Sequence, residues 1–150
     1  MPVIRLETRI NAPAKTCFDL SRSVEAHTDS FSHTHERVVE GRTSGLFEAG
    51  ETVTWEAKHF GIRQRLTVRI TKMEPYFFFE DVMVKGAFKS FEHQHCFEQH
   101  SGYTMMKDVF TYEVPGWIFG RIADAMFIKR YMTRLLTIRN EAIKRTAEKP

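Results

Sequence analysis

Two histidines in the stretch FEHQHCF, His93 and His95, are the residues of this chain whose type and spacing most directly suggest chemistry. They are flanked at the same two-residue spacing by Phe91 and Phe97. Residues two apart in a β-strand point to the same face of a sheet. The stretch is therefore compatible with a metal site, an acid–base site, or a polar group in the wall of an apolar pocket, and the surrounding elements must decide among them.

The composition indicates one soluble globular domain, which we place at residues 1–150. The hydrophobic fraction of 42% is ordinary, but 13 phenylalanines exceed what the core of so small a domain needs. They suggest aromatic side chains that line an internal space. The net charge of +3 comes from 22 basic and 19 acidic residues interleaved along the chain, and no RNA-stacking or recognition-helix pattern accompanies them. We therefore expect no nucleic-acid partner.

The two cysteines, Cys17 and Cys96, have no CxxC spacing, which fits a reducing compartment better than a disulfide scaffold. The first ten residues, MPVIRLETRI, carry charges throughout and lack an apolar signal core. The apolar stretch WIFGRIADAMFI is interrupted by Arg121 and Asp124 and is too short to cross a membrane. We expect a cytoplasmic protein, either a monomer or a homodimer.

The pattern of the chain predicts an α+β fold. A first strand at residues 3–10 is followed by two short helices, the first with Asn11 as N-cap and Pro13 in its first turn, the second over VEAHTDSF. Alternating stretches then predict consecutive antiparallel strands at residues 36–41, 51–59, 62–72, 76–84, 88–100 and 103–112. Helical character runs from Trp117 to about Glu148. The result is a curved antiparallel sheet of about seven strands wrapped on a long C-terminal helix.

Tight turns set which side chains share a face. A two-residue turn at Phe60-Gly61 pairs His59 with Ile62, Ala57 with Gln64, Trp55 with Leu66, and Val53 with Val68. The opposite face of this hairpin is rich in Glu, Lys, Arg and Thr and is expected to face water. His59 and Gln64 are then polar residues on the apolar face.

A second turn at Ser101-Gly102 sets Phe97 against Met106, His95 against Asp108, His93 against Phe110, and Phe91 against Tyr112. Opposed residues have Cβ atoms about 5 Å apart, so a hydrogen bond between His95 and Asp108 is within reach. If the preceding hairpin turns over residues 85–87, Asp81 faces Phe91 and Phe79 faces His93. A tighter turn would reverse that facing.

Several polar groups thus converge with aromatic residues on one face, as in a small-molecule pocket. The predicted ligand-binding residues are Trp55, His59, Gln64, Phe79, Asp81, Phe91, His93, His95, Phe97, Met106, Asp108, Phe110, Met132 and Leu135. The last two belong to the apolar stripe expected on the long helix, which comprises Ile118, Ile122, Ala125, Ile128, Met132, Leu135, Leu136 and Ile143.

The chain resembles the helix-grip fold of the START-like superfamily, also called SRPBCC proteins, over nearly its whole length. The resemblance is carried by INAPAKTCFDL, VTWEAKHFGIRQRLTVRI, GAFKSFEHQHCFE and FGRIADAMFIKRYMTRLLTIRN. These stretches are similar to a bacterial ligand-binding subgroup near the polyketide cyclase/dehydrase-like proteins. The resemblance implies a hydrophobic cavity between sheet and C-terminal helix that binds a lipid, quinone, steroid-like or polyketide-like molecule. It assigns no catalytic residue by position.

Metal and cofactor chemistry are not expected. His93, His95 and Asp108 have the side chains of a catalytic zinc site, but Phe110 rather than a ligand opposes His93. The other histidine cluster, His27, His33 and His35, could form a second site, but an exposed polar loop is the preferred interpretation.

Binding of a small hydrophobic molecule is the preferred function. The alternative is a cyclase or dehydratase that uses His95 and Asp108 as an acid–base pair, joined by His93, against the simpler interpretation that the pair only satisfies its own hydrogen bonds. The C-terminal helix carries Lys129, Arg130, Arg134, Arg139, Lys144 and Arg145. We interpret these as a solvated face, with transient contact with an anionic membrane surface as the functional alternative.

Overall fold

The structure is a computed structural model that describes residues 1–116 and 122–150. Its elements are β1 (Val3–Ile10), α1 (Ala14–Ser21), α2 (Val24–Ser30), η1 (Ser32–Thr34), β2 (Arg37–Glu40), β3 (Thr52–His59), β4 (Ile62–Glu74), β5 (Phe78–Lys85), β6 (Ser90–His100), β7 (Tyr103–Glu113) and α3 (Ile122–Ala147). The predicted start of the long helix at Trp117, and Ile118 of its stripe, lie outside the described residues. So does the side chain of Ile122.

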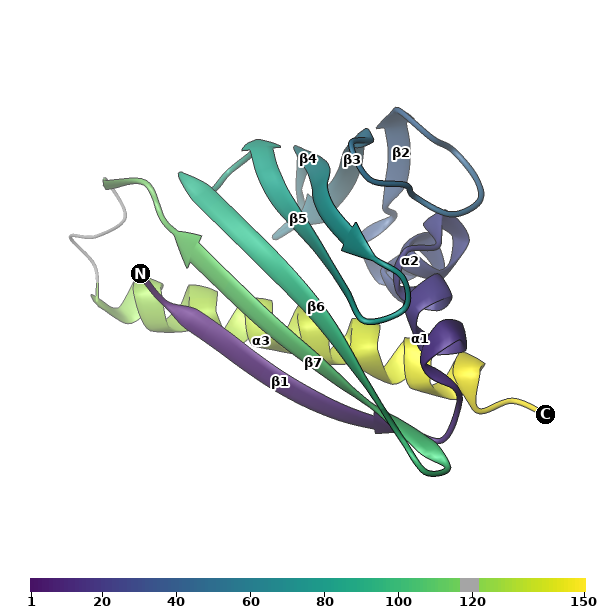
Figure 1. Cartoon of the computed structure of the whole chain (residues 1–150). Helices are drawn as coiled ribbons and strands as arrows, with labels where there is room; N and C mark the ends of the chain where they lie inside the picture. Colours follow the sequence, from purple (N-terminus) through teal and green to yellow (C-terminus); the bar gives the residue numbers. More distant parts are fainter. Residues whose placement is uncertain (117–121) are drawn as a thin grey trace.

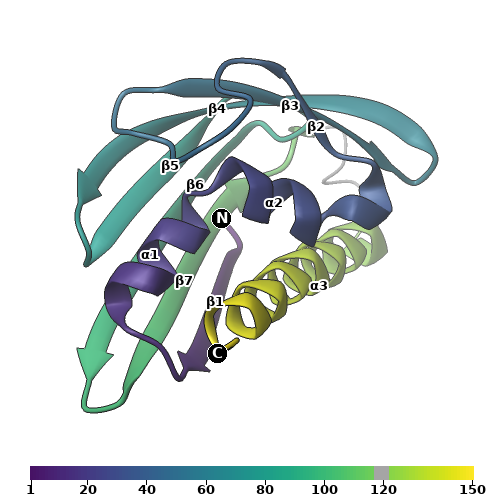
Figure 2. The same ribbon diagram turned by 90° about the vertical axis from the view of Figure 1, so that its right-hand side faces the viewer.

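The seven strands form one antiparallel sheet in the order β1-β7-β6-β5-β4-β3-β2. The sheet curves, and α3 runs along its concave side, while α1 and α2 cover one end of the space between them (Figures 1 and 2). The predicted α+β helix-grip architecture is therefore confirmed. Within the described part of the chain, no helix is long and apolar enough to cross a membrane.

The registers of both tight hairpins match the predictions. β3 and β4 pair His59 with Ile62 and Trp55 with Leu66 across the Phe60-Gly61 turn, and β6 and β7 pair His95 with Asp108. Both turn residues have positive φ, 55° at Phe60 and 75° at Gly61, as the two-residue turn of a twisted hairpin requires. Sequence periodicity and turn length were enough here because a two-residue connection permits few registers.

The predicted register between β5 and β6 is wrong by two residues. Asp81 pairs with His93 rather than Phe91, and Phe79 pairs with His95 rather than His93. The connection spans residues 86–89, which is longer than a tight turn and does not dictate a register. Because the shift is even, the inward-facing set of side chains is unchanged.

The start of α1 differs from the prediction. Pro13, not Asn11, is the N-cap, and no side chain of the cap residue bonds the helix. The amide of Ala14 instead donates to Oε1 of Gln99 at 2.7 Å, so a distant strand satisfies this helix end. The amide of Asn11 donates to Oε2 of Glu148 and ties the chain before α1 to the end of α3.

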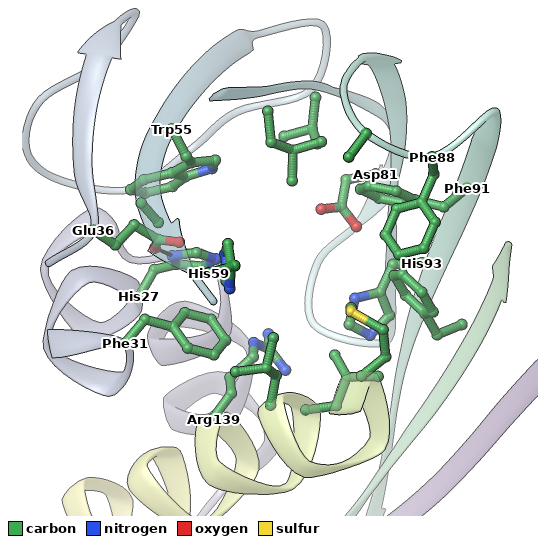
Figure 3. Close-up of a pocket in the computed structure, with 18 of the residues that line it drawn as sticks. His27, Phe31, Glu36, Trp55, His59, Asp81, Phe88, Phe91, His93 and Arg139 are labelled. Carbon is green, nitrogen blue, oxygen red and sulfur yellow. Dashed lines mark ion pairs between the residues drawn. The ribbon is translucent and has the colours of Figure 1, made fainter. Parts of the chain in front are cut away.

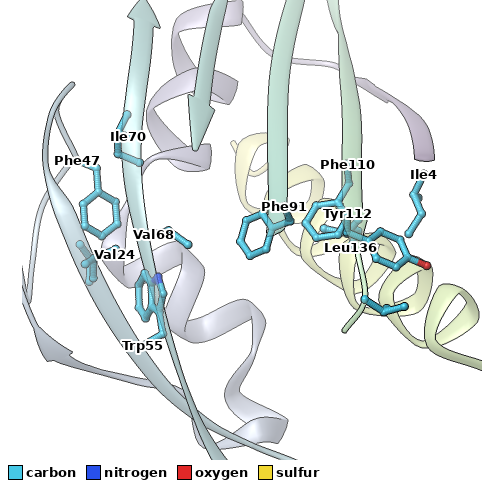
Figure 4. Close-up of a cluster of buried hydrophobic side chains, with 12 residues drawn as sticks. Ile4, Val24, Phe47, Trp55, Val68, Ile70, Phe91, Phe110, Tyr112 and Leu136 are labelled. Carbon is cyan, nitrogen blue, oxygen red and sulfur yellow. The ribbon is translucent and has the colours of Figure 1, made fainter. Parts of the chain in front are cut away.

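Two groups of buried apolar residues hold the molecule together. The first includes Trp55 and Val68 on one side and Phe91 and Leu136 on the other, and Figure 4 shows these as two separate walls. The second group gathers at the α1 end and consists of Ile10, Ala12, Ala14, Cys17, Phe18, Phe79, Phe97, Met106 and Ile143. The core is therefore dense at one end, while the other end surrounds a space.

Candidate ligand cavity and its buried polar cluster

A cavity of about 440 Å³ lies between the concave side of the sheet and α3. This volume is within the range of small-molecule sites, roughly 300–1,000 Å³. The structure places most of the predicted ligand-binding residues in its wall: Trp55, His59, Gln64, Phe79, Asp81, Phe91, His93, His95, Phe110, Met132 and Leu135. α3 contributes Met132 and Leu135, and the sheet contributes the others because they occupy alternate positions on its concave face.

Three of the predicted ligand-binding residues do not line the cavity. Phe97 and Met106 lie in the second apolar group, where Phe97 packs edge-on against Phe18. Asp108 is only 1% exposed and lies behind the histidines. The prediction that these side chains point to the concave face of the sheet was correct. The direction of a side chain does not show, however, how far along a strand the cavity extends.

His95 has both ring nitrogens occupied. Its Nδ1 atom lies 3.3 Å from Nη2 of Arg139, and its Nε2 atom lies 3.1 Å from Oδ1 of Asp81. A guanidinium can only donate, so Nδ1 is the acceptor and Nε2 carries the proton that Asp81 accepts. The predicted His95–Asp108 hydrogen bond is absent, because Nδ1 lies 3.6 Å from that carboxylate. His95 is therefore a neutral imidazole with no nitrogen left for a ligand.

The electrostatics agree with this geometry. Burial, together with the neighbouring His93 and Arg139, lowers the pKa of His95 to about 3, and the hydrogen bond to Asp81 only partly opposes this. A general base works best with a pKa near the operating pH. His95 is thus a poor candidate for proton abstraction.

His93 has one nitrogen held and one open. Its Nε2 atom lies 2.7 Å from Oδ1 of Asp108, and its Nδ1 atom has no hydrogen-bond partner among the described residues. Burial raises the pKa of Asp108, but the hydrogen bond from His93 and the charge of Arg139 outweigh it and lower the pKa overall. Asp108 is therefore ionised and accepts the Nε2 proton, so Nδ1 is the acceptor in the neutral form of the His93 ring. The buried pair that orients a histidine toward the cavity is His93–Asp108, not His95–Asp108.

The sequence analysis missed two residues that complete this cluster. Arg139, assigned there to a solvated face, is 4% exposed, and its Nη1 atom donates to Oδ1 of Asn140 at 2.9 Å. Nδ2 of Asn140 in turn donates to Oδ2 of Asp108 at 2.7 Å. A signal was available, because positions 139 and 140 fall at helical spacing between Leu136 and Ile143 on the apolar stripe. A charged residue on such a stripe indicates a buried partner.

Asp81, His93 and His95 are also the one group of described residues with metal-ligand spacing, their ligand atoms lying within 4.8 Å of one another. The residues are suitable, but Arg139 donates to His95 and brings a positive charge to the site. That charge opposes a divalent cation, and the neutral tautomer of His95 directs a proton toward Asp81. The arrangement favours hydrogen bonding over metal coordination.

The opposite wall carries polar groups that the sequence analysis did not place in the pocket. His27 was expected in an exposed loop with His33 and His35, but only the latter two are exposed. His27 and Glu36 line the cavity with His59, whose Nδ1 atom lies 2.6 Å from the hydroxyl of Tyr131. Figure 3 shows His27, Glu36 and His59 across the cavity from Asp81 and His93, with Arg139 between the two walls.

Comparison with known proteins agrees with the architecture. The model of a family described as polyketide cyclase / dehydrase and lipid transport matches residues 10–132. A search of curated proteins gave no match.

Solved structures with the same fold come from bacteria and plants. TTHA0849 from Thermus thermophilus superposes with a TM-score of 0.75 at 20% identity, covering 98% of this chain and 100% of that one. The Zhui aromatase/cyclase from Streptomyces sp. R1128 gives 0.72 at 13% identity over 98% and 93%. The major latex-like protein 151 from Panax ginseng gives 0.66 at 12% identity over 99% and 98%. At these identities the similarity shows the fold alone.

Proposed function

Because the chain belongs to the polyketide cyclase/dehydrase and lipid transport family, within the START-like (SRPBCC) superfamily, we propose that it binds or carries one small, mostly hydrophobic molecule in the cavity between the sheet and α3. The ligand class is a lipid, quinone, steroid-like or polyketide-like molecule. The observation that carries the proposal is the position of a buried polar cluster in the wall of a cavity that is otherwise largely aromatic and aliphatic. The apolar walls favour burial of the hydrophobic part of the ligand, and the Nδ1 atom of His93 binds one polar group of the ligand.

Filling the cavity tests this function directly. Ala57 is buried on β3 and lines the cavity, so Ala57→Phe should abolish the fluorescence gain of anilinonaphthalene sulfonate while the circular dichroism spectrum is retained. Met132→Trp fills the same space from α3, so the test can still be made if Ala57→Phe does not fold. Ala49→Phe, on an exposed loop, is the matched control. Unchanged probe binding in both folded cavity variants would reject the proposal.

The second candidate function is that of a cyclase or dehydratase. One observation favours it: the Nδ1 atom of His93 has no hydrogen-bond partner among the described residues, and Asp108 orients the ring through the other nitrogen. This arrangement can accept a proton from a carbon acid such as the methylene of a β-diketone. The measurable step is exchange of the central hydrogen of benzoylacetone for deuterium, followed by NMR. Acceleration that is lost in His93→Gln supports catalysis, and equal rates in the two proteins reject it.

Ligand exchange at an anionic membrane surface is the third part of the proposal. Phe60, Ile62, Met126 and Phe127 are large apolar side chains that are more than half exposed. Phe60 contacts Phe127 and Tyr131, so the β3–β4 turn meets α3 at the rim of the cavity. Exposed basic residues flank this group: Lys58, Arg63, Lys129 and Arg130. An apolar patch with a basic border is suited to brief contact with anionic lipids.

We also propose that residues 1–150 act as one ligand-binding domain in the cytoplasm. The free thiols of Cys17 and Cys96 are compatible with a reducing compartment.

A further inference from the structure

His27 and Glu36 form a polar pair in the cavity wall opposite His93. The Nδ1 atom of His27 lies 2.5 Å from Oε1 of Glu36, a close contact without hydrogen-bond geometry, and neither atom has a hydrogen-bond partner among the described residues. The imidazole stacks on Trp55 with ring centroids 4.1 Å apart and 16° between the planes, and Phe31 packs against its edge. Three neighbours thus hold the ring in one orientation, which is more than an incidental surface histidine requires.

The pair is buried on its carboxylate side and open on its imidazole side. The Glu36 side chain is 10% exposed, whereas 26% of the His27 side chain remains accessible, and both residues line the cavity. The Nε2 atom of His27 has no ion-pair partner in the described part of the chain. A ring held at Nδ1 therefore presents its other nitrogen as the atom available to a bound molecule.

The two walls repeat one arrangement. On one side Asp108 holds His93 at Nε2 and leaves Nδ1 open, and on the other Glu36 contacts His27 at Nδ1 and leaves Nε2 open. Figure 3 shows His27 and His93 on opposite sides of the cavity, with Trp55 beside the first and Phe91 beside the second. When a carboxylate lies against one nitrogen of a neutral imidazole, the ring proton is favoured on that nitrogen and the other nitrogen is an acceptor. The complementary ligand group is a hydroxyl, which donates to that nitrogen.

We propose that His27 and Glu36 form a second anchor of the ligand site, and that the ligand is an aromatic or polycyclic molecule with a hydroxyl group at each of two separated ends. One hydroxyl binds His93 and the other binds His27, while the aromatic side chains enclose the body between them. This inference rests on the function proposed above and narrows its ligand class. A simple fatty acid or a hydrocarbon with one polar end leaves one anchor unused.

Three stilbenes with the same carbon skeleton test the proposal: trans-stilbene, its para-hydroxy derivative and its symmetrical para-dihydroxy derivative. Their affinities for the wild-type protein are measured by quenching of tryptophan fluorescence. Each hydrogen bond that replaces one to water contributes on the order of 1 kcal/mol, so each added hydroxyl should tighten binding roughly fivefold. The expected order is dihydroxy, then monohydroxy, then stilbene.

Two variants test whether the gain in affinity from the second hydroxyl comes from His27 and Glu36. His27→Phe keeps the aromatic stack on Trp55 and should reduce the affinity for the dihydroxy compound to that for the monohydroxy compound, with stilbene itself unaffected. Glu36→Gln removes the carboxylate with little change of shape and should reduce the same gain, which covers the case that His27→Phe does not fold. His33→Phe, an exposed position three residues before Glu36, is the matched control and should change no affinity.

The outcomes separate the two proposals. If stilbene binds and the hydroxyls add nothing, or if His27→Phe weakens all three compounds equally, the second anchor is wrong and the binding function stands. The same holds if anilinonaphthalene sulfonate binds and no stilbene does. If neither the stilbenes nor that dye bind the wild-type protein, both proposals fail.

Discussion

The Nε2 atom of His93 lies 2.7 Å from Oδ1 of Asp108 although these residues are not opposite each other in the sheet. The residue opposite Asp108 is His95, which turns its Nε2 atom to Asp81 instead. The two imidazoles stack with centroids 3.8 Å apart and divide two carboxylates between them. The consequence is a division of roles: His95 is a closed structural group, and His93 is open to the cavity.

The neutral state of His95 makes the stability of the fold depend on pH. The folded pKa of about 3 lies below the ordinary value of 6.5, so between these values the unfolded chain takes up a proton that the folded protein does not. The free energy of unfolding should therefore fall as the pH drops below about 6.5, by up to ~1.4 kcal/mol per pH unit. Asp81 and Asp108, with lowered pKa values, lose their contributions only below about pH 4.

Urea denaturation between about pH 7 and pH 5 measures this slope. His95→Gln should reduce the slope, since Gln keeps hydrogen-bonding capacity without a titrating group; the part that remains comes from His59, whose pKa burial also lowers. His100→Gln, on the exposed end of β6, is the control and should keep the wild-type slope. An unchanged slope in His95→Gln would show that His95 is protonated in the folded state.

Asp108 should be the most costly carboxylate to remove. Its negative charge compensates the buried guanidinium of Arg139, 3.5 Å away. Its carboxylate oxygens accept hydrogen bonds from His93 and Asn140. Asp108→Asn leaves that cation without its compensating charge and should lower the free energy of unfolding by about 3–5 kcal/mol. The matched change Asp81→Asn affects a side chain that is 20% exposed and should cost only about 1–2 kcal/mol. Equal losses in thermal denaturation would contradict the assigned network.

Phe60 adopts a backbone conformation that disfavours phenylalanine. Its φ of 55° lies in the left-handed region, and its side chain is 60% exposed. Phe60→Asn creates the Asn-Gly sequence preferred in this turn and should raise the free energy of unfolding by up to about 1 kcal/mol. The same variant removes the contact with Tyr131 at the rim of the cavity, so ligand dissociation should become faster in stopped-flow measurements.

The neighbouring strand residue provides the comparison for this prediction. Ile62 is also exposed, at 62%, but has ordinary strand geometry, so Ile62→Asn should lower stability through its poorer strand propensity. A loss of stability in Phe60→Asn as well would show that the aromatic contacts outweigh the backbone strain.

The basic residues of α3 beside the apolar patch should control membrane association. Reversal of both charges in Lys129→Glu/Arg130→Glu should weaken cosedimentation with phosphatidylserine-containing vesicles at least tenfold, since each basic residue near such a surface contributes about 1 kcal/mol. The matched double reversal Arg145→Glu/Lys149→Glu, at exposed positions near the C-terminal end of the chain, should have little effect. Equal weakening by the two changes would indicate a response to net charge and not a docking patch.

Local sequence determined the facing of the side chains and the hairpin registers. The alternation of polar and apolar residues and the two-residue turns after His59 and His100 were sufficient to place Trp55, Gln64 and His93 on the concave face, because strand periodicity is two and a short turn leaves one register. The β5–β6 register was beyond reach, since a four-residue connection allows several pairings that keep the same facing.

The partners of the polar groups were decided by the tertiary structure. Arg139 and Asn140 come from α3, His27 from α2 and Glu36 from the segment before β2, and only their packing against the sheet brings them to the cavity. Sequence could place His95 opposite Asp108, but a guanidinium from a distant helix occupies one nitrogen of that imidazole and redirects the other to Asp81. Periodicity sets the direction of a side chain, whereas its hydrogen-bond partner depends on every element that reaches the same volume.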